Sequence, residues 1–269
     1  MEAPATTTLE VRADGERGTI MLNRPDKLNP LGTVTLRELV AVARWFDEQP
    51  QVKVVVIGGH GRAFSAGADL AAFTAVDSDT AALRAAADAG RQMAEAIEAM
   101  TAVTVARIHG HCVGGALVLA AACDLRVAAE DARFSIPEVD LGIPLAWGGI
   151  PRLVREIGPA LAKELVLTCR PFDAAEAKTA GFLNRVVPAG DLDAAVEELT
   201  AALVTKSAMT LSATKRHTNA VTAGMVDPGR AWNDADSLLA AMNDTESRRA
   251  AAQYLANRDL ANRAAGTTR

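Results

Sequence analysis

The sequence predicts an α/β protein, and three observations carry this expectation. Unbroken β-branched runs, VKVVVIGG at residues 52–59 and VTVARIHG at residues 103–110, are typical of buried strands. Segments with helical periodicity separate these runs, as in α/β folds. No strand pattern is present after Asp191, so the end of the chain is expected to be helical. We therefore expect a core over residues 1–204 and a C-terminal helical region over residues 205–269.

Each predicted element has a local reason. The first helix has Leu36, Leu39, Val40, Ala43 and Phe46 at helical spacing, and an Ala-rich segment predicts the second helix. In chain order we expect two strands around a glycine-containing turn within residues 8–25, a helix at 33–47, the strand at 52–59, a helix at 79–100 and the strand at 103–110. These are followed by a helix that opens at Gly114 and Gly115, a strand at 124–129, helices near 150–157, 161–168 and 174–180, and a strand at 185–188. From residue 191 onward we expect only helices, with a break at Pro228 and Gly229.

Composition excludes several classes of function. The 269 residues carry a net charge of −5 with both signs interspersed, and aromatic residues are few, so nucleic-acid binding is not expected. The three cysteines lack metal-ligand spacing and indicate a reducing compartment; Cys112 and Cys123 are expected to be small core residues. The start of the chain does not read as a signal peptide, and no run is long enough to span a membrane. We expect a cytoplasmic protein without a metal site.

Two strand-to-turn junctions share one pattern. GGHGRAFSAGADL at residues 58–70 and RIHGHCVGGALVL at residues 107–119 each follow a buried strand and each place small residues directly after it. Small side chains let backbone N–H groups approach a ligand, and in the second junction these groups lie at a helix N-terminus. Two such sites that face one point would form an oxyanion hole. Tight turns with close backbone packing are the alternative for each junction alone.

Four motifs together resemble the enoyl-CoA hydratase/isomerase family, also called the crotonase superfamily. LNRPDKLNPL (22–31) is similar to its coenzyme-A loop, GRAFSAGADL (61–70) to its first oxyanion motif, HGHCVGGALVLAAACDLRVA (109–128) to its second, and FSIPEVDLGIPLAWGGIPRLVREIG (134–158) to its catalytic-glutamate segment. The resemblance implies a spiral of β-β-α repeats, trailing helices that build homotrimers or homohexamers, and an acyl-CoA thioester substrate. Coenzyme A belongs to the substrate, and no separate cofactor is implied.

The resemblance also assigns roles to residues. By motif position, the N–H groups of Ala68 and Gly115 would hold the thioester oxygen, and Glu138, after Pro137, would be the acid/base. Arg24 either meets a phosphate of coenzyme A or is a solvated surface charge. The remaining substrate-binding or pocket residues expected from the motifs are Lys27, Leu28, Ala66, Asp69, Leu70, Gly114, Val118 and Trp147, the last of which is alternatively a core residue.

The sequence departs from the family at one catalytic position. Hydratases of this family usually carry a second glutamate three residues after the second oxyanion glycine, where this chain has Val118. A general acid or base contributes about 10²–10⁴-fold to a rate, so its loss should impair hydration. Moving a double bond from C3 to C2 needs only one base, and an apolar neighbour would favour a raised pKa for Glu138. The departure therefore points to Δ3-Δ2 enoyl-CoA isomerisation in fatty-acid metabolism.

Other polar residues near the motifs are weaker candidates. Asp140 would replace the missing acid only if it shares a face with Glu138; otherwise it is a cap or an ion-pair partner. His109 and His111 flank the glycine turn and are expected to be hydrogen-bonded turn residues. Dienoyl-CoA isomerases of the family have a second acid where this chain has Ala146, which disfavours that activity. A hydratase with a substitute group and a non-catalytic acyl-CoA binder stay open as alternatives.

Overall fold

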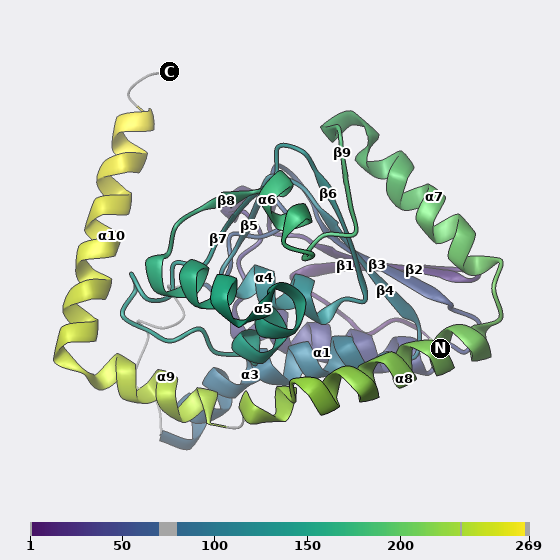
Figure 1. Ribbon diagram of the computed structural model, residues 1–269, viewed down its shortest axis with the longest axis horizontal. Helices are drawn as coiled ribbons and strands as arrows, with labels where there is room; N and C mark the ends of the chain where they lie inside the picture. The colour runs from purple at the N-terminus through teal and green to yellow at the C-terminus, as the bar shows by residue number, and fades with distance from the viewer. Residues whose placement is uncertain (1, 70–79, 232, 267–269) are drawn as a thin grey trace.

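The computed structural model describes residues 2–69, 80–231 and 233–266, which form two β-sheets surrounded by helices (Figure 1). The strands are β1 (Leu9–Asp14), β2 (Arg17–Leu22), β3 (Val54–Gly59), β4 (Val103–Ile108), β5 (His111–Val113), β6 (Leu125–Ala129), β7 (Arg133–Ser135), β8 (Phe172–Asp173) and β9 (Arg185–Val187). The helices are α1 (Thr33–Asp47), α3 (Thr80–Ala99), α4 (Gly115–Ala122), α5 (Gly149–Thr168), α6 (Ala174–Thr179), α7 (Leu192–Val204), α8 (Ala208–Met225), α9 (Asp234–Asn243) and α10 (Thr245–Gly266). The predicted α/β class is confirmed.

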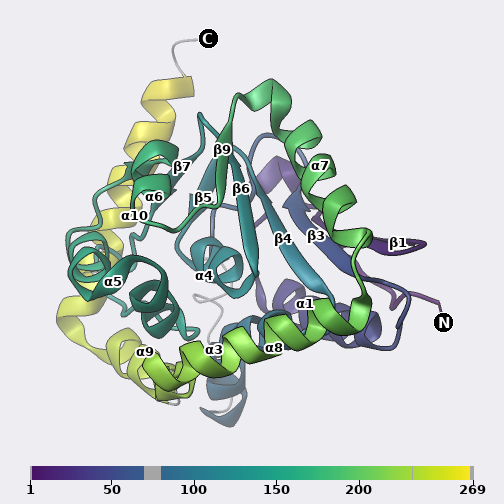
Figure 2. The ribbon, with the colours of Figure 1, turned by 45° about the vertical axis from the view of Figure 1, so that its right-hand side comes forward.

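The chain alternates between the two sheets as a spiral. The larger sheet has the order β1-β2-β3-β4-β6-β9, and the smaller has the order β5-β7-β8. Strand β4 is followed by β5 in the smaller sheet, and α4 then returns the chain to β6, beside β4. The next repeat runs through β7, α5, β8 and α6 before β9 pairs with β6. Figure 2 shows α4 beside the larger sheet, with α5 packed on the other side of α4.

The smaller sheet is a correction to the sequence prediction. Its strands span only two or three residues, which is too short for an alternating pattern to stand out, and none was predicted. The chain therefore does not turn directly from β4 into a helix, because β5 comes first and pairs with β7. The predicted break within α5 is confirmed, since Gly158 leaves helical geometry at φ 75° and Pro159 follows it.

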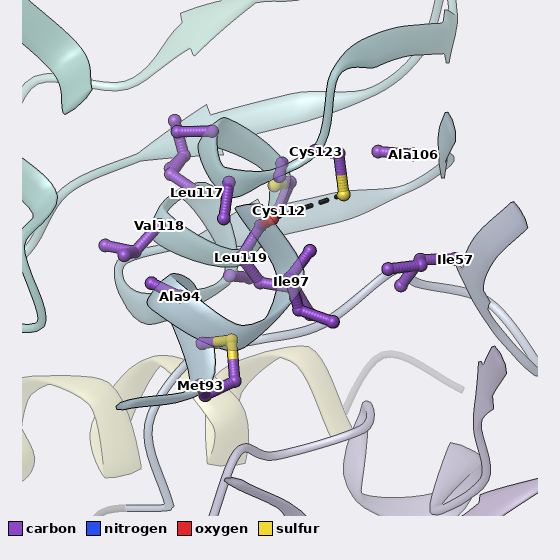
Figure 3. Close-up of a cluster of buried hydrophobic side chains, with 14 of the residues drawn as sticks. Ile57, Met93, Ala94, Ile97, Ala106, Cys112, Leu117, Val118, Leu119 and Cys123 are labelled. Atoms are coloured by element: carbon purple, nitrogen blue, oxygen red, sulfur yellow. Dashed lines mark hydrogen bonds between the residues drawn. The ribbon is translucent and has the colours of Figure 1, made fainter. Parts of the chain in front are cut away.

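Helix α4 lies at the centre of the core. All eight of its residues are buried, so it is apolar on every face rather than on one stripe. Figure 3 shows its side chains packed against α3, β3 and β4, with the Cys123 thiol donating to the Leu119 carbonyl at 3.4 Å. Cys112 and Cys123 are buried core residues, as expected, and burial raises the pKa of both thiols.

The C-terminal helices pack against the spiral instead of standing apart from it. Lys215 on α8 donates to the Ala102 carbonyl at 2.9 Å and pairs with Asp124 at 2.8 Å, which fixes α8 at the ends of β4 and β6. Helix α9 packs along α3, where Asp236 pairs with Arg84 at 2.8 Å. Helix α10 follows at the edge of the molecule (Figure 1). Among the described helices, none combines the length and apolar character that a membrane crossing requires.

Candidate active site

The first junction is held in place by a buried asparagine. Asn29 lies in the left-handed region at φ 54°, and its side-chain amide donates to the carbonyls of His60 and Ala63, both at 2.9 Å. The Ser65 hydroxyl donates to the Asn29 carbonyl at 2.7 Å and accepts the Gly67 N–H at 3.1 Å. These bonds fasten the loop that contains Leu28 to the junction after β3. They also give Ser65 a structural role.

In the second junction, neither Gly114 nor Gly115 has room for a side chain. Gly114 has φ 53°, and a Cβ built on it would lie 2.3 Å from the Oε1 atom of Glu138. A Cβ built on Gly115 would lie 2.2 Å from the Trp147 ring. One glycine therefore makes room for the carboxylate and the other makes room for the indole, both in the segment that follows β7. A side chain at either position would displace a neighbour that faces the same pocket.

The two junctions meet in space. A Cβ built on Gly67 would lie 2.4 Å from the Val113 carbonyl oxygen and 3.6 Å from the Gly115 nitrogen. Ala68, directly after Gly67, and Gly115 line the same pocket. Within the described part of the chain, neither the Ala68 nor the Gly115 N–H donates a hydrogen bond to another residue. Two N–H donors therefore border one pocket, and one of them belongs to the first residue of α4.

Glu138 is the acid of this pocket. Its side chain is 8% exposed, and its Oε2 atom has no partner within the described residues. Burial raises its pKa to about 7, because ionising a carboxyl away from water is costly. No other described residue that lines the pocket has an ionisable side chain. The others are Ala68, Gly115, Val118, Ile143, Pro144, Leu145, Ala146, Trp147 and Leu238.

Trp147 is held in an uncommon backbone conformation. Its φ is 63° and that of Gly148 is 70°, and its ring fills the space that a Cβ on Gly90 of α3 would need, 2.0 Å from the nearest ring atom. The Gly148 N–H donates to Asp234 at 2.8 Å, and the Gly148 carbonyl accepts from Arg152 at 3.1 Å. Helices α9 and α5 thus fix the backbone beside the indole from two sides.

Arg152, which donates to the Gly148 carbonyl, is itself held by an ion pair. Arg152 is 1% exposed, and it donates to Glu98 of α3 at 2.5 Å. Arg155 donates to the other oxygen of Glu98 at 2.7 Å, and the two arginines keep the pKa of Glu98 low although burial opposes this. A buried charge with several charge-assisted bonds is fixed in place. The position of the Trp147 ring is therefore set by α3, α5 and α9 together.

The residues expected to meet coenzyme A lie on the outer side of the first junction. Arg24 pairs with Asp69 at 3.2 Å, and both side chains are partly exposed. Lys27 is exposed at the end of a 3-10 turn, Pro25–Lys27, and Leu28 follows it at φ 59°. The Ala66 N–H donates to the Leu28 carbonyl at 2.9 Å. Asp69 and Trp147 line a neighbouring pocket, whereas Leu70 lies outside the described residues.

Several sequence candidates are not brought to the pocket. Asp140 is exposed and does not line it, so it does not stand in for the missing acid. His109 contacts the Gly61 carbonyl at 2.9 Å, and burial lowers its pKa, which fits a turn residue. His111 is exposed. Pro137 is half-buried behind Glu138 and is not a pocket residue. Val118 and Ala146 line the pocket and bring no acid to it.

Sequence reasoning missed the part of the site that comes from the C-terminal region. Leu238 on α9 lines the Glu138 pocket, and Asp234 holds the backbone after Trp147. Both lie about one hundred residues after Glu138, and no local motif marks them. The structural role of Asn29 was also missed; the one signal in the sequence is that asparagine tolerates left-handed backbone better than most residues.

Comparison with known proteins decides the family. A family model described as enoyl-CoA hydratase/isomerase matches residues 17–262. The chain belongs to the enoyl-CoA hydratase/isomerase family. It is 39% identical over 217 residues, 80% of each chain, to a Mycobacterium bovis protein named probable enoyl-CoA hydratase. It is 32% identical, over 77% of this chain and 80% of the other, to a protein from Arabidopsis thaliana named peroxisomal Δ(3,5)-Δ(2,4)-dienoyl-CoA isomerase.

Solved structures of the family share the fold. A crystal structure of an enoyl-CoA hydratase from Mycobacterium avium subsp. paratuberculosis superposes with a TM-score of 0.84 at 26% identity, covering 94% of this chain and 97% of the other. The crotonase resemblance stated from the four motifs is thus confirmed, and the chain is an enzyme of the hydratase/isomerase family with an acyl-CoA substrate as the family expectation.

Proposed function

We propose that this enoyl-CoA hydratase/isomerase family member converts 3-enoyl-CoA thioesters to trans-2-enoyl-CoA thioesters, with Glu138 as the only acid/base. The observation that carries the proposal is that Glu138 is the one ionisable side chain among the described residues that line its pocket. A hydratase must both activate a water molecule and protonate C2. An isomerase needs one group that removes a proton and returns it.

The proposed reaction moves one proton and one double bond. The Glu138 carboxylate removes a proton from C2, and the electron pair of that C–H bond passes into the C2–C1 bond while the thioester oxygen takes up negative charge. The same carboxyl then returns the proton to C4, as the C3–C4 double bond shifts to C2–C3 and the thioester carbonyl re-forms. The pKa of about 7 suits both halves, because the group is neither a strong acid nor a strong base near neutral pH.

We propose the N–H groups of Ala68 and Gly115 as the oxyanion hole. Both residues line the Glu138 pocket, and in the described structure neither N–H has another acceptor. The Gly115 N–H also lies at the N-terminus of α4, where the helix dipole favours negative charge. Donors fixed before the reaction stabilise the developing charge without reorganisation, which is commonly the largest contribution to such catalysis.

The apolar wall supports the choice of isomerisation. Val118 and Trp147 occupy the pocket beside the carboxylate, and both are nearly inaccessible to solvent. A dry pocket disfavours attack by water and keeps the transferred proton on the carboxyl until it is returned. The coenzyme-A end of the substrate is proposed to lie over Lys27, Leu28 and Ala66, at the exposed edge of the first junction.

Hydration is the second candidate function, favoured by the names of the relatives. The Mycobacterium bovis relative is named a probable hydratase, as are most of the relatives compared. For a hydratase, another group would have to position water, and the described pocket residues offer backbone carbonyls but no second acid. A non-catalytic acyl-CoA binder is the third candidate, and it would bind thioesters without turnover.

A paired turnover assay separates these functions. The purified protein receives a 3-enoyl-CoA in one reaction and a trans-2-enoyl-CoA in the other, and absorbance of the conjugated thioester is followed. Isomerisation predicts that conjugation appears in the first reaction and is lost with Glu138→Gln. Rapid loss of conjugation in the second reaction supports hydration instead. No change of absorbance in either reaction, with acyl-CoA binding intact, supports a non-catalytic acyl-CoA binder.

Self-association is proposed from the C-terminal helices. Met209, Val221 and Met225 on α8 are 81%, 54% and 77% exposed. Val221 and Met225 are four residues apart and share a face of α8, and a homotrimer or a pair of trimers would bury these exposed apolar side chains. Sedimentation equilibrium of the wild type and of Met209→Glu tests the proposal, which predicts a trimer or hexamer that dissociates in the variant.

A further inference from the structure

A second apolar cavity lies between the C-terminal helices and the segment after Glu138. Its volume is about 410 Å³, which is within the range of small-molecule sites. Helix α9 contributes Leu238, Leu239 and Met242, helix α10 contributes Ala251 and Leu255, and the loop after Glu138 contributes Ile143. Leu238 is buried and the other five are half-buried, so their apolar atoms face the cavity as well as the protein.

This cavity adjoins the catalytic pocket. Ile143 and Leu238 line both spaces, so the two share a wall and an edge. In the catalytic pocket the same two side chains stand with Glu138, Ala68 and Gly115. A hydrocarbon chain that passed from the catalytic pocket into the cavity at this boundary would meet two apolar side chains, those of Ile143 and Leu238.

The polar groups of the cavity lie at its outer rim. Arg248 is the only ionisable residue among its described lining residues, and it is exposed, as is Asn243. On α10 the lining positions Ser247, Ala251 and Leu255 are spaced by four residues, so one helical face forms the outer wall. The interior therefore favours an uncharged hydrocarbon, because its apolar lining offers no partner for a polar substituent.

The backbone fixes this outer wall close to the site. Gly142 has φ 67°, and a Cβ built on it would lie 2.2 Å from the Ser247 carbonyl oxygen. The start of α10 is thus packed directly on the loop that follows Glu138. The cavity is bounded by this contact and by α9, which packs on α3.

We propose that this cavity holds the distal part of the substrate's acyl chain, so that the enzyme prefers straight-chain acyl groups of about eight carbons or more over four-carbon ones. The inference rests on the proposed acyl-CoA function and specifies its substrate class. Each methylene moved fully out of water contributes about 0.8 kcal/mol, which is about fourfold in affinity. The proposed occupant is the acyl chain, and a helix of a second copy of this protein is the competing occupant.

Binding of saturated acyl-CoAs tests the inference without requiring turnover. Calorimetry with butanoyl-, octanoyl- and dodecanoyl-CoA on the full-length wild type is expected to show affinity rising at least about tenfold from four to eight carbons. Ala251→Trp fills the cavity from α10 and should remove this increase while leaving butanoyl-CoA binding unchanged. Ala252→Trp is the matched control, because Ala252 is the next residue of α10, is exposed and does not line the cavity.

The outcomes distinguish this inference from the proposed reaction. Equal affinity for all three chain lengths, or an equal effect of the two tryptophan variants, overturns it even if isomerase activity is present. If affinity rises with acyl-chain length and this rise is lost only in Ala251→Trp, the inference is upheld even if the reaction is hydration. A change of oligomeric state in Ala251→Trp, measured by sedimentation with no change in chain-length dependence, assigns the cavity to a second copy and also overturns it.

Discussion

The Glu138 carboxylate occupies the space that a side chain on Gly114 would need. The Oε1 atom lies 2.3 Å from the position of a Cβ on Gly114, far inside normal contact distance. The glycine that lets the backbone turn into α4 therefore also lets the acid approach the start of that helix. The position of the proposed acid and the turn into α4 both depend on the absence of a Cβ at position 114.

Gly114→Ala is expected to reduce turnover by at least about 100-fold, because the new methyl group displaces the acid and strains a backbone with φ 53°. The measurement is kcat for 3-enoyl-CoA. Gly190→Ala is the matched control, since Gly190 has open space around it. Equal activity of the two variants would show that the contact with Glu138 is unimportant.

Glu138→Gln is expected to lower kcat by about 10²–10⁴-fold, because the amide cannot accept the C2 proton. In the wild type, kcat/KM should rise with pH and level off above about 7, since the carboxylate form is the base and burial raises its pKa to about 7. The profile is measured between pH 5 and 9. An acid limb centred near pH 4.5 would contradict the raised pKa.

The same substitution should make the protein more stable at high pH. The folded state keeps the Glu138 proton up to about pH 7, whereas the ordinary pKa of the group is 4.5, so stability is lost as pH rises between these values. Glu138→Gln removes this cost, and the difference in the free energy of unfolding should grow towards about 3 kcal/mol at pH 8.5. Urea unfolding at pH 5.5 and 8.5, at one protein concentration, measures it. A difference that shrinks with rising pH would have the wrong sign.

Val118→Glu is expected to raise the rate of hydration of trans-2-enoyl-CoA, by up to about 100-fold, because a second carboxylate can position and deprotonate water. Val118 is 1% exposed, so the new acid should also cost about 1–3 kcal/mol in the free energy of unfolding. Val118→Gln is the control, since it adds a polar group that cannot act as a base at neutral pH. Rapid hydration by the wild type would contradict the proposal that Val118, in place of a glutamate, makes this enzyme an isomerase.

Asp234→Ala should displace the Trp147 ring, because the buried Gly148 N–H loses the acceptor now 2.8 Å away. An expected cost of about 1–3 kcal/mol in stability accompanies a fall in kcat. Asp234→Asn keeps an acceptor and should restore most of both. The readout is the fluorescence of Trp147 in a background where Trp45 and Trp232 are phenylalanine.

The matched control for that experiment lies on the same helix. Asp236 pairs with Arg84 on the surface, where both side chains are about half exposed, and it does not contact the Gly148 backbone. Asp236→Ala should therefore leave the fluorescence and kcat unchanged. If the two alanine variants behave alike, α9 does not position the indole.

The sequence was informative where a local pattern carries the structure. The runs that became β3 and β4 are apolar and β-branched, and α1 has the predicted bounds because its apolar residues recur at helical spacing. Strands β5, β7 and β8 are formed by pairing between repeats, so their two or three residues show no pattern of their own. Their existence depends on tertiary contacts that a local pattern does not encode.

The same division holds for the site. Glu138, Ala68 and Gly115 stand in motifs whose small residues and proline are visible in the sequence, and the structure brings all three to one pocket. Leu238 and Asp234 reach it only because α9 folds back onto α3. The Trp147 ring fills the space that a side chain on Gly115 would need. The two residues are thirty-two positions apart in the sequence, so only the folded chain reveals this contact.

The central claim is that one carboxyl, that of Glu138, removes the proton from C2 and returns it to C4. It is tested most directly with a 3-enoyl-CoA that carries deuterium at C2, by mass spectrometry and NMR of the product. The account predicts trans-2-enoyl-CoA with deuterium at C4 above the level that solvent would supply, and no product with Glu138→Gln. A product whose C4 hydrogen comes entirely from solvent, formed equally fast by Glu138→Gln, would contradict it.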